Sequence, residues 1–134
     1  MDESGELSIG DVVAATGLGV HALRFFEREG LFPREIARTA GGRRVYTRAD
    51  VEWLLLCNRF RASGMPLATL RAFVDLVRAG PGNEPERLAL LREHESAVRA
   101  RIAELDACLE IIQHKVATYE SHVQAGTAAS LWNP

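Results

Sequence analysis

Six arginines lie within one short stretch of the chain, residues 20–46. The stretch also holds three glutamates, so its formal net charge is +3, whereas the whole 134-residue chain carries -2. A guanidinium group presents a planar fork of donors that suits phosphate oxygens. Arginines concentrated beside aromatic residues therefore indicate a surface for a polyanion such as nucleic acid. A solvated basic face is the alternative that charge alone leaves open.

Catalytic and metal-binding patterns are absent from the sequence. It has no Ser/His/Asp order, phosphate-cradling glycine loop or HExxH motif, so we expect no enzyme, no catalytic residue, no metal site and no cofactor. Cys57 and Cys108 stand too far apart to suggest a disulfide framework, which favours a reducing cytoplasm. No apolar run approaches the roughly 18 residues that span a bilayer, and residues 1–10 lack the apolar core of a signal peptide. We expect a cytoplasmic protein with no membrane partner.

Two short helices are expected to position the first arginines. Ser8 and Asp11 have the spacing of a capping box, and the helix that they open should stop at Gly17. A second helix is expected over residues 20–29. Two short helices joined by a tight glycine-containing turn predict a helix-turn-helix.

The second helix has an apolar face and a basic face. Its apolar face, which we expect to pack in the core, consists of Ala22, Leu23 and Phe26. The opposite face carries His21, Arg24 and Arg28, with Phe25 at its edge. A helix laid in a major groove would bring this face to phosphates and base edges. A plain surface role for His21 and an edge-of-core role for Phe25 remain alternatives.

A glycine-rich hairpin follows the second helix. Residues 36–39 and 43–46 flank the turn at residues 40–42, which predicts two paired strands that lean on the helices. Three arginines lie on or beside the tip: Arg38, Arg43 and Arg44. This hairpin resembles a wing, a hairpin beside a helix-turn-helix that contacts the phosphate backbone without reading sequence.

Two more helices complete the N-terminal part. Thr47 and Asp50 form a second capping box, and the helix that they open, to about Ala62, is apolar nearly all round. A helix of this kind must be buried on both sides. One side can cover the winged helix-turn-helix, and the other needs a different partner, such as another subunit. A fourth helix should end near Gly80.

The C-terminal third predicts a coiled coil. Residues 81–87 form a linker, after which apolar residues recur every three or four positions for five heptads. The seam contains Leu88, Leu91, Glu95, Val98, Ile102, Leu105, Leu109, Ile112, Val116, Tyr119 and Val123. A helix of roughly 50 Å cannot bury this seam on its own small domain. We therefore expect a homodimer through Leu91, Val98, Ile102, Leu105, Leu109, Ile112, Val116 and Tyr119.

The expected organisation has four parts. Residues 1–80 form a DNA-binding domain with an accessory helix pair, residues 81–87 a linker, residues 88–123 the dimerisation coil and residues 124–134 a tail. The tail is either disordered or docked through Trp132. A coiled-coil interaction protein without a nucleic acid partner is the alternative. It explains the heptads but not the arginine-rich hairpin.

These segments together resemble the MerR family of bacterial transcription regulators. Residues 24–27, Arg-Phe-Phe-Glu, stand where the family has Arg-Tyr-Tyr-Glu, and residues 42–46, Gly-Arg-Arg-Val-Tyr, match its wing strand, Gly-Tyr-Arg-Leu-Tyr. The resemblance implies a mainly α fold, with a winged helix-turn-helix followed by a long helix that forms an antiparallel coiled-coil dimer. It also implies a dimer that bends and untwists promoter DNA for RNA polymerase.

The resemblance also assigns residues to DNA. It places Arg24 and Phe25 on the DNA face and Arg43 and Arg44 on the wing, and we add Tyr46 at the end of the wing strand. Phenylalanine at position 25 cannot donate a hydroxyl to a phosphate, whereas the arginine contacts are unaffected.

The sequence also resembles a subgroup of short MerR members. Some of these respond to aldehydes or other thiol-reactive compounds through one cysteine in the third helix, and Cys57 stands at about that place. A stress signal acting through Cys57 is therefore one hypothesis. The other is that Cys57 is a small core hydrophobe.

Overall fold

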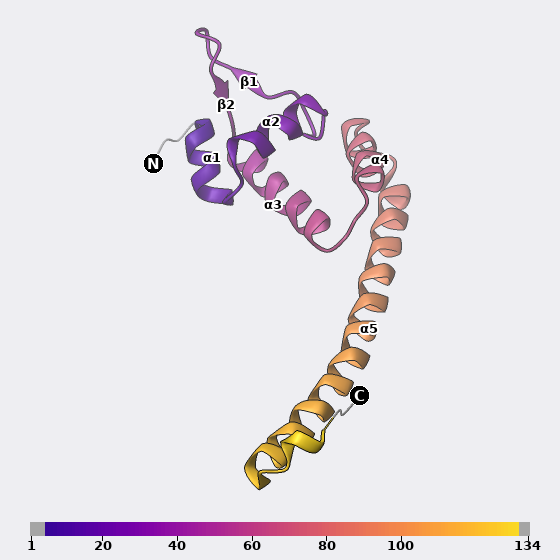
Figure 1. Ribbon diagram of the computed structural model, residues 1–134. Coiled ribbons are helices and arrows are strands. Elements are labelled where there is room, and N and C mark those ends of the chain that lie inside the picture. The colour runs from indigo at the N-terminus through magenta and orange to yellow at the C-terminus, as the bar shows by residue number, and fades with distance from the viewer. Residues whose placement is uncertain (1–4, 132–134) are drawn as a thin grey trace. The chain divides into compact units, whose positions relative to one another are not determined.

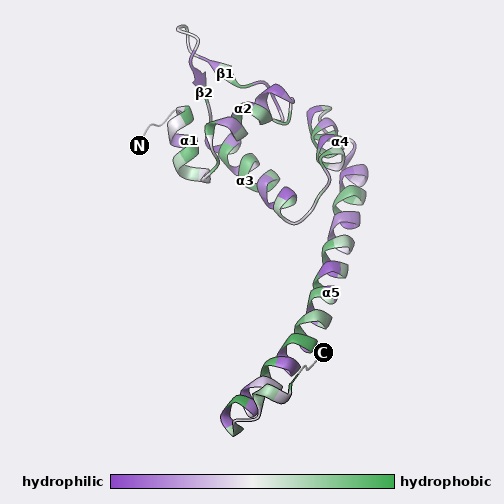
Figure 2. Cartoon of the chain, in the orientation of Figure 1, coloured by the Kyte–Doolittle hydropathy of each residue, from purple (hydrophilic) through white to green (hydrophobic). Residues whose placement is uncertain are grey.

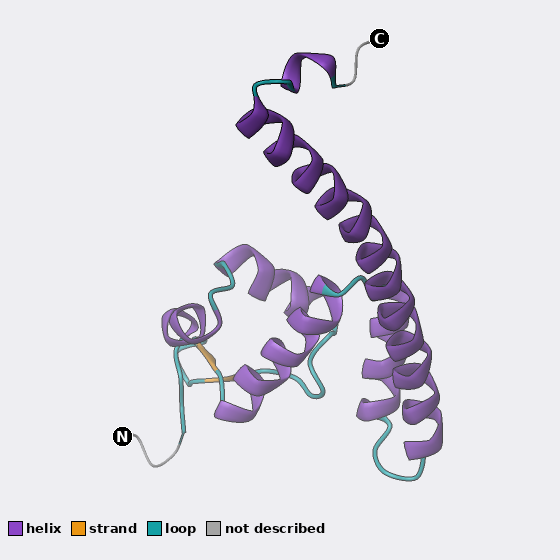
Figure 3. Ribbon diagram, turned by 90° about the horizontal axis from the view of Figure 1, so that it is seen from below, coloured by secondary structure: helices purple, strands orange, loops and turns teal. Residues whose placement is uncertain are grey.

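The structure is a computed structural model, and it describes residues 5–131. It is mainly helical, with one two-stranded sheet (Figures 1 and 3). The chain forms two compact units, one up to His94 and one from Glu95 onward. The predicted fold class, a winged helix-turn-helix followed by a long helix, is confirmed.

The first two helices form the predicted helix-turn-helix. α1 (Ile9–Thr16) begins at Ser8, whose hydroxyl accepts a hydrogen bond from the Asp11 amide, while the Asp11 carboxylate accepts one from the Ser8 amide. These hydrogen bonds hold the pKa of Asp11 below its usual range. The helix ends at Gly17, whose positive φ of 74° suits glycine. α2 (Val20–Arg28) follows after a short turn, as the sequence predicts.

The wing is a hairpin with shorter strands than predicted. β1 (Ala37–Arg38) pairs antiparallel with β2 (Arg44–Val45), and Arg38 lies opposite Arg44. The predicted strands extend further in both directions. Tyr46 instead pairs with Leu7, in a bridge with two backbone hydrogen bonds of 2.8 Å. The segment before α1 therefore anchors the base of the hairpin.

α3 (Arg48–Ala62) and α4 (Leu67–Arg78) complete the core of the first unit. The second capping box is present, and its Asp50, only 1% exposed, also accepts a hydrogen bond from Arg34. The buried cluster contains Val12, Leu23, Phe26, Leu31, Phe32, Ile36, Tyr46, Val51, Leu54, Cys57, Met65, Leu70 and Val74.

One side of α3 was expected to cover the winged helix-turn-helix, and the other to need a different partner such as another subunit. Leu54 and Cys57 face the core, but Leu55 and Leu56 are about two-fifths exposed. These two leucines therefore leave part of α3 exposed in a single copy.

α5 (Glu84–Ala125) is one continuous helix of 42 residues. It begins inside the segment predicted as a linker, because a proline such as Pro85 is tolerated in the first helical turn, where no intrahelical donor is required. None of its described residues is buried, and apolar and polar segments alternate along it (Figure 2). After α5 a short 3₁₀ helix, η1, spans Ala128–Ser130. Trp132, the proposed docking residue of the tail, lies outside the described residues.

No single helix between residues 5 and 131 is long and apolar enough to cross a membrane. The bent pair α1 and α2 passes that test of length and composition only when both are taken together. Its apolar residues Val12, Leu23 and Phe26 belong to the buried core.

Candidate nucleic-acid interface

α2 presents the two faces that its sequence predicts. Leu23 and Phe26 are buried, whereas His21, Arg24 and Arg28 are exposed. Phe25 is half-buried and makes an edge contact with the Phe26 ring. The guanidinium carbon of Arg28 lies 5.8 Å from the centroid of the Phe25 ring. The basic face is therefore available to a partner, and Phe25 borders both this face and the core.

The three wing arginines differ in their partners. Arg44 donates from Nε to Glu27 Oε2 at 2.6 Å. Arg38 lies 3.7 Å from the other carboxylate oxygen of Glu27 and donates to the carbonyl of Gly42. Arg43 is exposed and forms no ion pair with any residue that the structure describes. Two wing arginines are therefore held against α2, and the third is left to solvent or to a ligand.

A hollow of about 220 Å³ lies between the start of α1, the basic face of α2 and the wing. Its lining consists of Ser8, Ile9, Arg24, Gly42, Arg43 and Arg44. The lining thus includes three arginines that are up to 20 positions apart in the sequence and no acidic residue, although Arg44 Nε donates to the Glu27 carboxylate outside the lining. Such an arrangement suits a phosphate group. We name it the arginine hollow.

Sequence reasoning missed Ser8 and Ile9 as members of this site. The sequence identifies Ser8 only as a helix cap, whereas in the fold it lines the same hollow as Arg24, next to the Leu7–Tyr46 bridge that joins the start of α1 to the wing. The available signal was its position at a helix N-terminus, where backbone amides favour anions.

Tyr46 does not lie on the interface. It is fully buried, and its ring centroid is 6.2 Å from that of Phe32. Burial raises the pKa of its phenol, and the nearby Glu27 carboxylate raises it further. The predicted contact of Tyr46 with DNA is therefore replaced by a core role, because the bridge to Leu7 turns the end of the wing strand into the protein.

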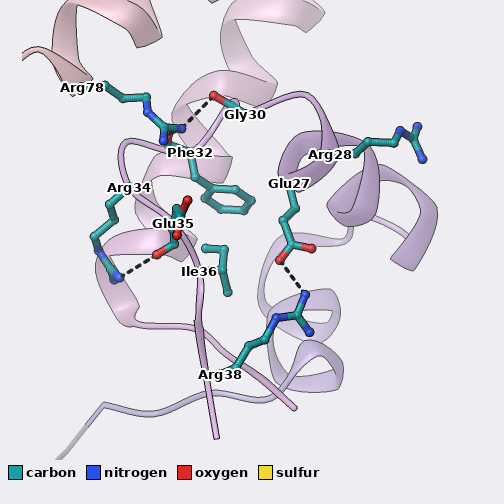
Figure 4. Close-up of a pocket in the computed structure, with 9 residues that line it drawn as sticks. All are labelled: Glu27, Arg28, Gly30, Phe32, Arg34, Glu35, Ile36, Arg38 and Arg78. Atoms are coloured by element: carbon teal, nitrogen blue, oxygen red, sulfur yellow. Dashed lines mark hydrogen bonds and ion pairs between the residues drawn. The ribbon is translucent and has the colours of Figure 1, made fainter. Parts of the chain in front are cut away.

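A second, larger hollow of about 310 Å³ is lined by residues of α2, of the loop that follows it, of β1 and by Arg78 of α4 (Figure 4). Two of its arginines are hydrogen-bonded to protein groups: Arg78 donates to the carbonyls of Gly30 and Phe32, and Arg34 donates to Asp50. Two glutamates also line it. These hydrogen bonds tie the loop between α2 and β1 to α4 through Arg78 and to α3 through Asp50.

Cys57 is completely buried in the core of the first unit. Burial raises the pKa of its thiol to about 12, so the thiolate, which is the nucleophile, is scarce at neutral pH. Cys108 is exposed on α5. Among the described residues, no three His, Cys, Asp or Glu side chains are placed to hold a metal ion together. The environment of Cys57 favours the core hypothesis over the sensor hypothesis.

We expect Cys57 to resist thiol reagents in the folded protein. In a Cys108→Ser variant, iodoacetamide should modify Cys57 at least about 100-fold more slowly than it modifies Cys108 in a Cys57→Ser variant, because the thiol is buried and protonated. The slow rate should persist from pH 7 to pH 10, below the Cys57 pKa of about 12. Mass spectrometry of timed samples measures both rates. Equal rates in the folded variants would contradict the expectation, and equal rates in urea serve as the control.

Two family models match this chain. The model for MerR HTH family regulatory proteins matches residues 7–76, and the model described as MerR, DNA binding, matches residues 51–115. The chain belongs to the MerR family. The residues that line the arginine hollow all fall within the stretch that the MerR HTH family model matches.

Relatives cover most of this MerR family chain. An uncharacterized HTH-type transcriptional regulator of Haemophilus influenzae is 30% identical over 115 residues, which are 86% of this chain and 84% of that one. The transcriptional regulator ZntR of Escherichia coli is 28% identical over 107 residues, 78% of this chain and 74% of that one. The protein is thus a transcriptional regulator and not an enzyme.

Solved structures share its fold. The crystal structure of HiNmlR, described as a MerR family regulator lacking the sensor domain and bound to promoter DNA, has a TM-score of 0.82 at 28% identity and covers 96% of this chain and 97% of that one. A MerR family regulator from Bacillus thuringiensis has a TM-score of 0.74 at 27% identity, covering 85% of this chain and 99% of that one.

Proposed function

We propose that this MerR family regulator acts as a homodimer in the cytoplasm, where it binds double-stranded promoter DNA and distorts it to control transcription by RNA polymerase. The arginine hollow is the main support for DNA contact, because Arg24, Arg43 and Arg44 line it and no acidic residue does. The promoter DNA bound to HiNmlR, a protein of similar fold, supports the choice of partner.

The proposed contacts divide between the recognition helix and the wing. α2 would enter the major groove with His21, Arg24 and Arg28, all exposed. Arg43 and Arg44 on the wing, together with Arg38 on the opposite strand, would contact phosphates beside the groove. Phe25 would pack against a sugar at the edge of α2. Each phosphate contact releases counterions, so binding should weaken steeply with salt.

The proposed dimer rests on the exposed seam of α5. The side chains of Ile102, Leu105, Leu109, Ile112, Val116 and Tyr119 are 42% to 58% exposed in the single chain. Leu91 and Val98, earlier in the helix, are intermediate in exposure. Burying apolar surface is worth about 25 cal/mol per Å², so a second copy packed antiparallel along this seam would be strongly favoured. Two copies would then present two basic modules to a pseudo-palindromic site.

Cys57 is the residue through which a thiol-reactive signal would act. An aldehyde or other thiol-reactive compound, of the kind to which some short members respond, could reach Cys57 only if the core around α3 opened. We therefore propose that Cys57 packs the resting core. The comparison of Cys57 and Cys108 reaction rates tests whether such an opening occurs.

Binding to the protein's own upstream region is the direct test. With a labelled duplex, we expect a sequence-selective complex whose log Kd rises linearly with log salt, with a slope magnitude of several, as for proteins that contact about six or more phosphates. A scrambled duplex of equal length is the control. A coiled-coil interaction protein would form no salt-sensitive complex with either duplex. Genome-wide mapping of occupied sites would then identify the regulated promoters.

A further inference from the structure

One carboxylate links the recognition helix to both strands of the wing. Glu27, on α2, contacts Arg44 of β2 through Oε2 at 2.6 Å and Arg38 of β1 through Oε1 at 3.7 Å. Figure 4 shows the Glu27 and Arg38 side chains pointing toward one another. The Glu27 and Arg44 side chains are 22% and 28% exposed. The contact with Arg44 is therefore partly shielded from solvent, where ion pairs are screened less than at an open surface, whereas the Arg38 side chain is 49% exposed.

The contact with Glu27 leaves part of the Arg44 guanidinium available. Only Nε donates to Glu27, and no hydrogen bond to a described residue occupies the two terminal nitrogens of Arg44. Arg44 also lines the arginine hollow together with Arg24 and Arg43. Glu27 thus restrains Arg44 through Nε, while the two terminal nitrogens can still bind a phosphate in the hollow.

The wing needs such a restraint. Each of its strands is two residues long, and a short two-stranded hairpin is marginally stable alone. Arg38 and Arg44 are opposite each other in the register, so their shared contact with Glu27 joins both strands to α2 at one level. Because ordering a long side chain upon binding lowers affinity, an arginine that is ordered beforehand binds more tightly.

We propose that Glu27 is a positioning residue for DNA binding, and that its negative charge strengthens the complex by fixing Arg44 and Arg38 for phosphate contact. This inference rests on the proposed function. Two effects oppose each other at this position. The charge of Glu27 repels phosphates, which alone would make its removal favourable, whereas its two contacts preset the wing. The shielding of the pair and the shortness of the strands make the second effect the larger.

The Glu27→Gln variant separates these effects by the sign of the change. Measured by fluorescence anisotropy on the upstream duplex, Glu27→Gln should raise Kd about tenfold and reduce the magnitude of the salt slope by about one per subunit. Glu29→Gln is the matched control. It removes the same charge at the end of α2, but Glu29 pairs with Arg71 of α4 instead of the wing, so its Kd should stay equal or fall.

A second measurement tests whether Glu27 acts through the wing arginines. In an Arg38→Ala, Arg44→Ala background, Glu27→Gln should leave Kd unchanged or lower it, because the residues that Glu27 positions are gone and only its repulsion of phosphates remains. A further tenfold loss in that background would overturn the proposal. So would a Glu27→Gln variant that binds the duplex as tightly as the wild type with an unchanged salt slope. Failure of the wild-type protein to bind any upstream duplex would instead refute the proposed function.

Discussion

Replacing Ile102 and Leu109 together with glutamate is expected to convert the protein to a monomer and to weaken operator binding by at least about 100-fold, because two linked half-site contacts become one. Both side chains lie on the seam of α5, and they are 53% and 48% exposed in the single chain. In a dimer, the substitutions would bury carboxylates without partners, which is strongly unfavourable. The proposed dimer could not tolerate them.

Sedimentation equilibrium and anisotropy on the same samples measure the two effects. The matched control replaces Ala100 and Ala107 with glutamate, which adds the same charge at exposed positions on the opposite side of the heptad. That variant should remain a dimer and keep its affinity within a few fold. If the seam variant stays dimeric, or if the wild-type protein is monomeric at micromolar concentration, the assignment of the seam is wrong.

Arg24→Ala should produce the second large loss, about 10- to 100-fold in operator affinity, which corresponds to the 1–3 kcal/mol expected when an arginine contact is removed. Arg24 is exposed on α2 and lines the arginine hollow. It forms no ion pair within the described part of the chain, so its removal should leave the melting temperature nearly unchanged. The salt slope should also fall in magnitude, by about one for each phosphate that the variant no longer neutralises.

Arg101→Ala is the comparison for Arg24→Ala, since Arg101 is an exposed arginine on α5, outside the unit that carries the wing. Both variants change the net charge equally. Equal decreases in affinity for the two would mean that Arg24 contributes only through net charge, and our assignment of α2 to the major groove would have to be abandoned.

Features that depend on neighbouring residues were predictable. The capping boxes of Ser8 and Thr47 are present because their partners stand three residues away, within reach inside one helical turn. The two faces of α2 follow from the 3.6-residue period, which fixes the direction of each side chain once the helix forms. The exposed seam of α5 follows from the same rule.

Features that depend on packing between distant segments were not predictable. Tyr46 was expected on the surface, yet it is buried because Leu7, 39 positions earlier, pairs with it. The link from Glu27 to the wing joins residues 17 positions apart, and no spacing rule indicates such a pair.

The sequence by itself determined the helices, their caps, the basic face of α2 and the apolar seam, since each arises from local backbone geometry and side-chain period. Only the tertiary structure decided which arginines are held and which are free, whether Cys57 and Tyr46 meet solvent, and which residues line the arginine hollow. These outcomes depend on distances between segments that the chain brings together only on folding, where burial and ion pairing are set by three-dimensional neighbours.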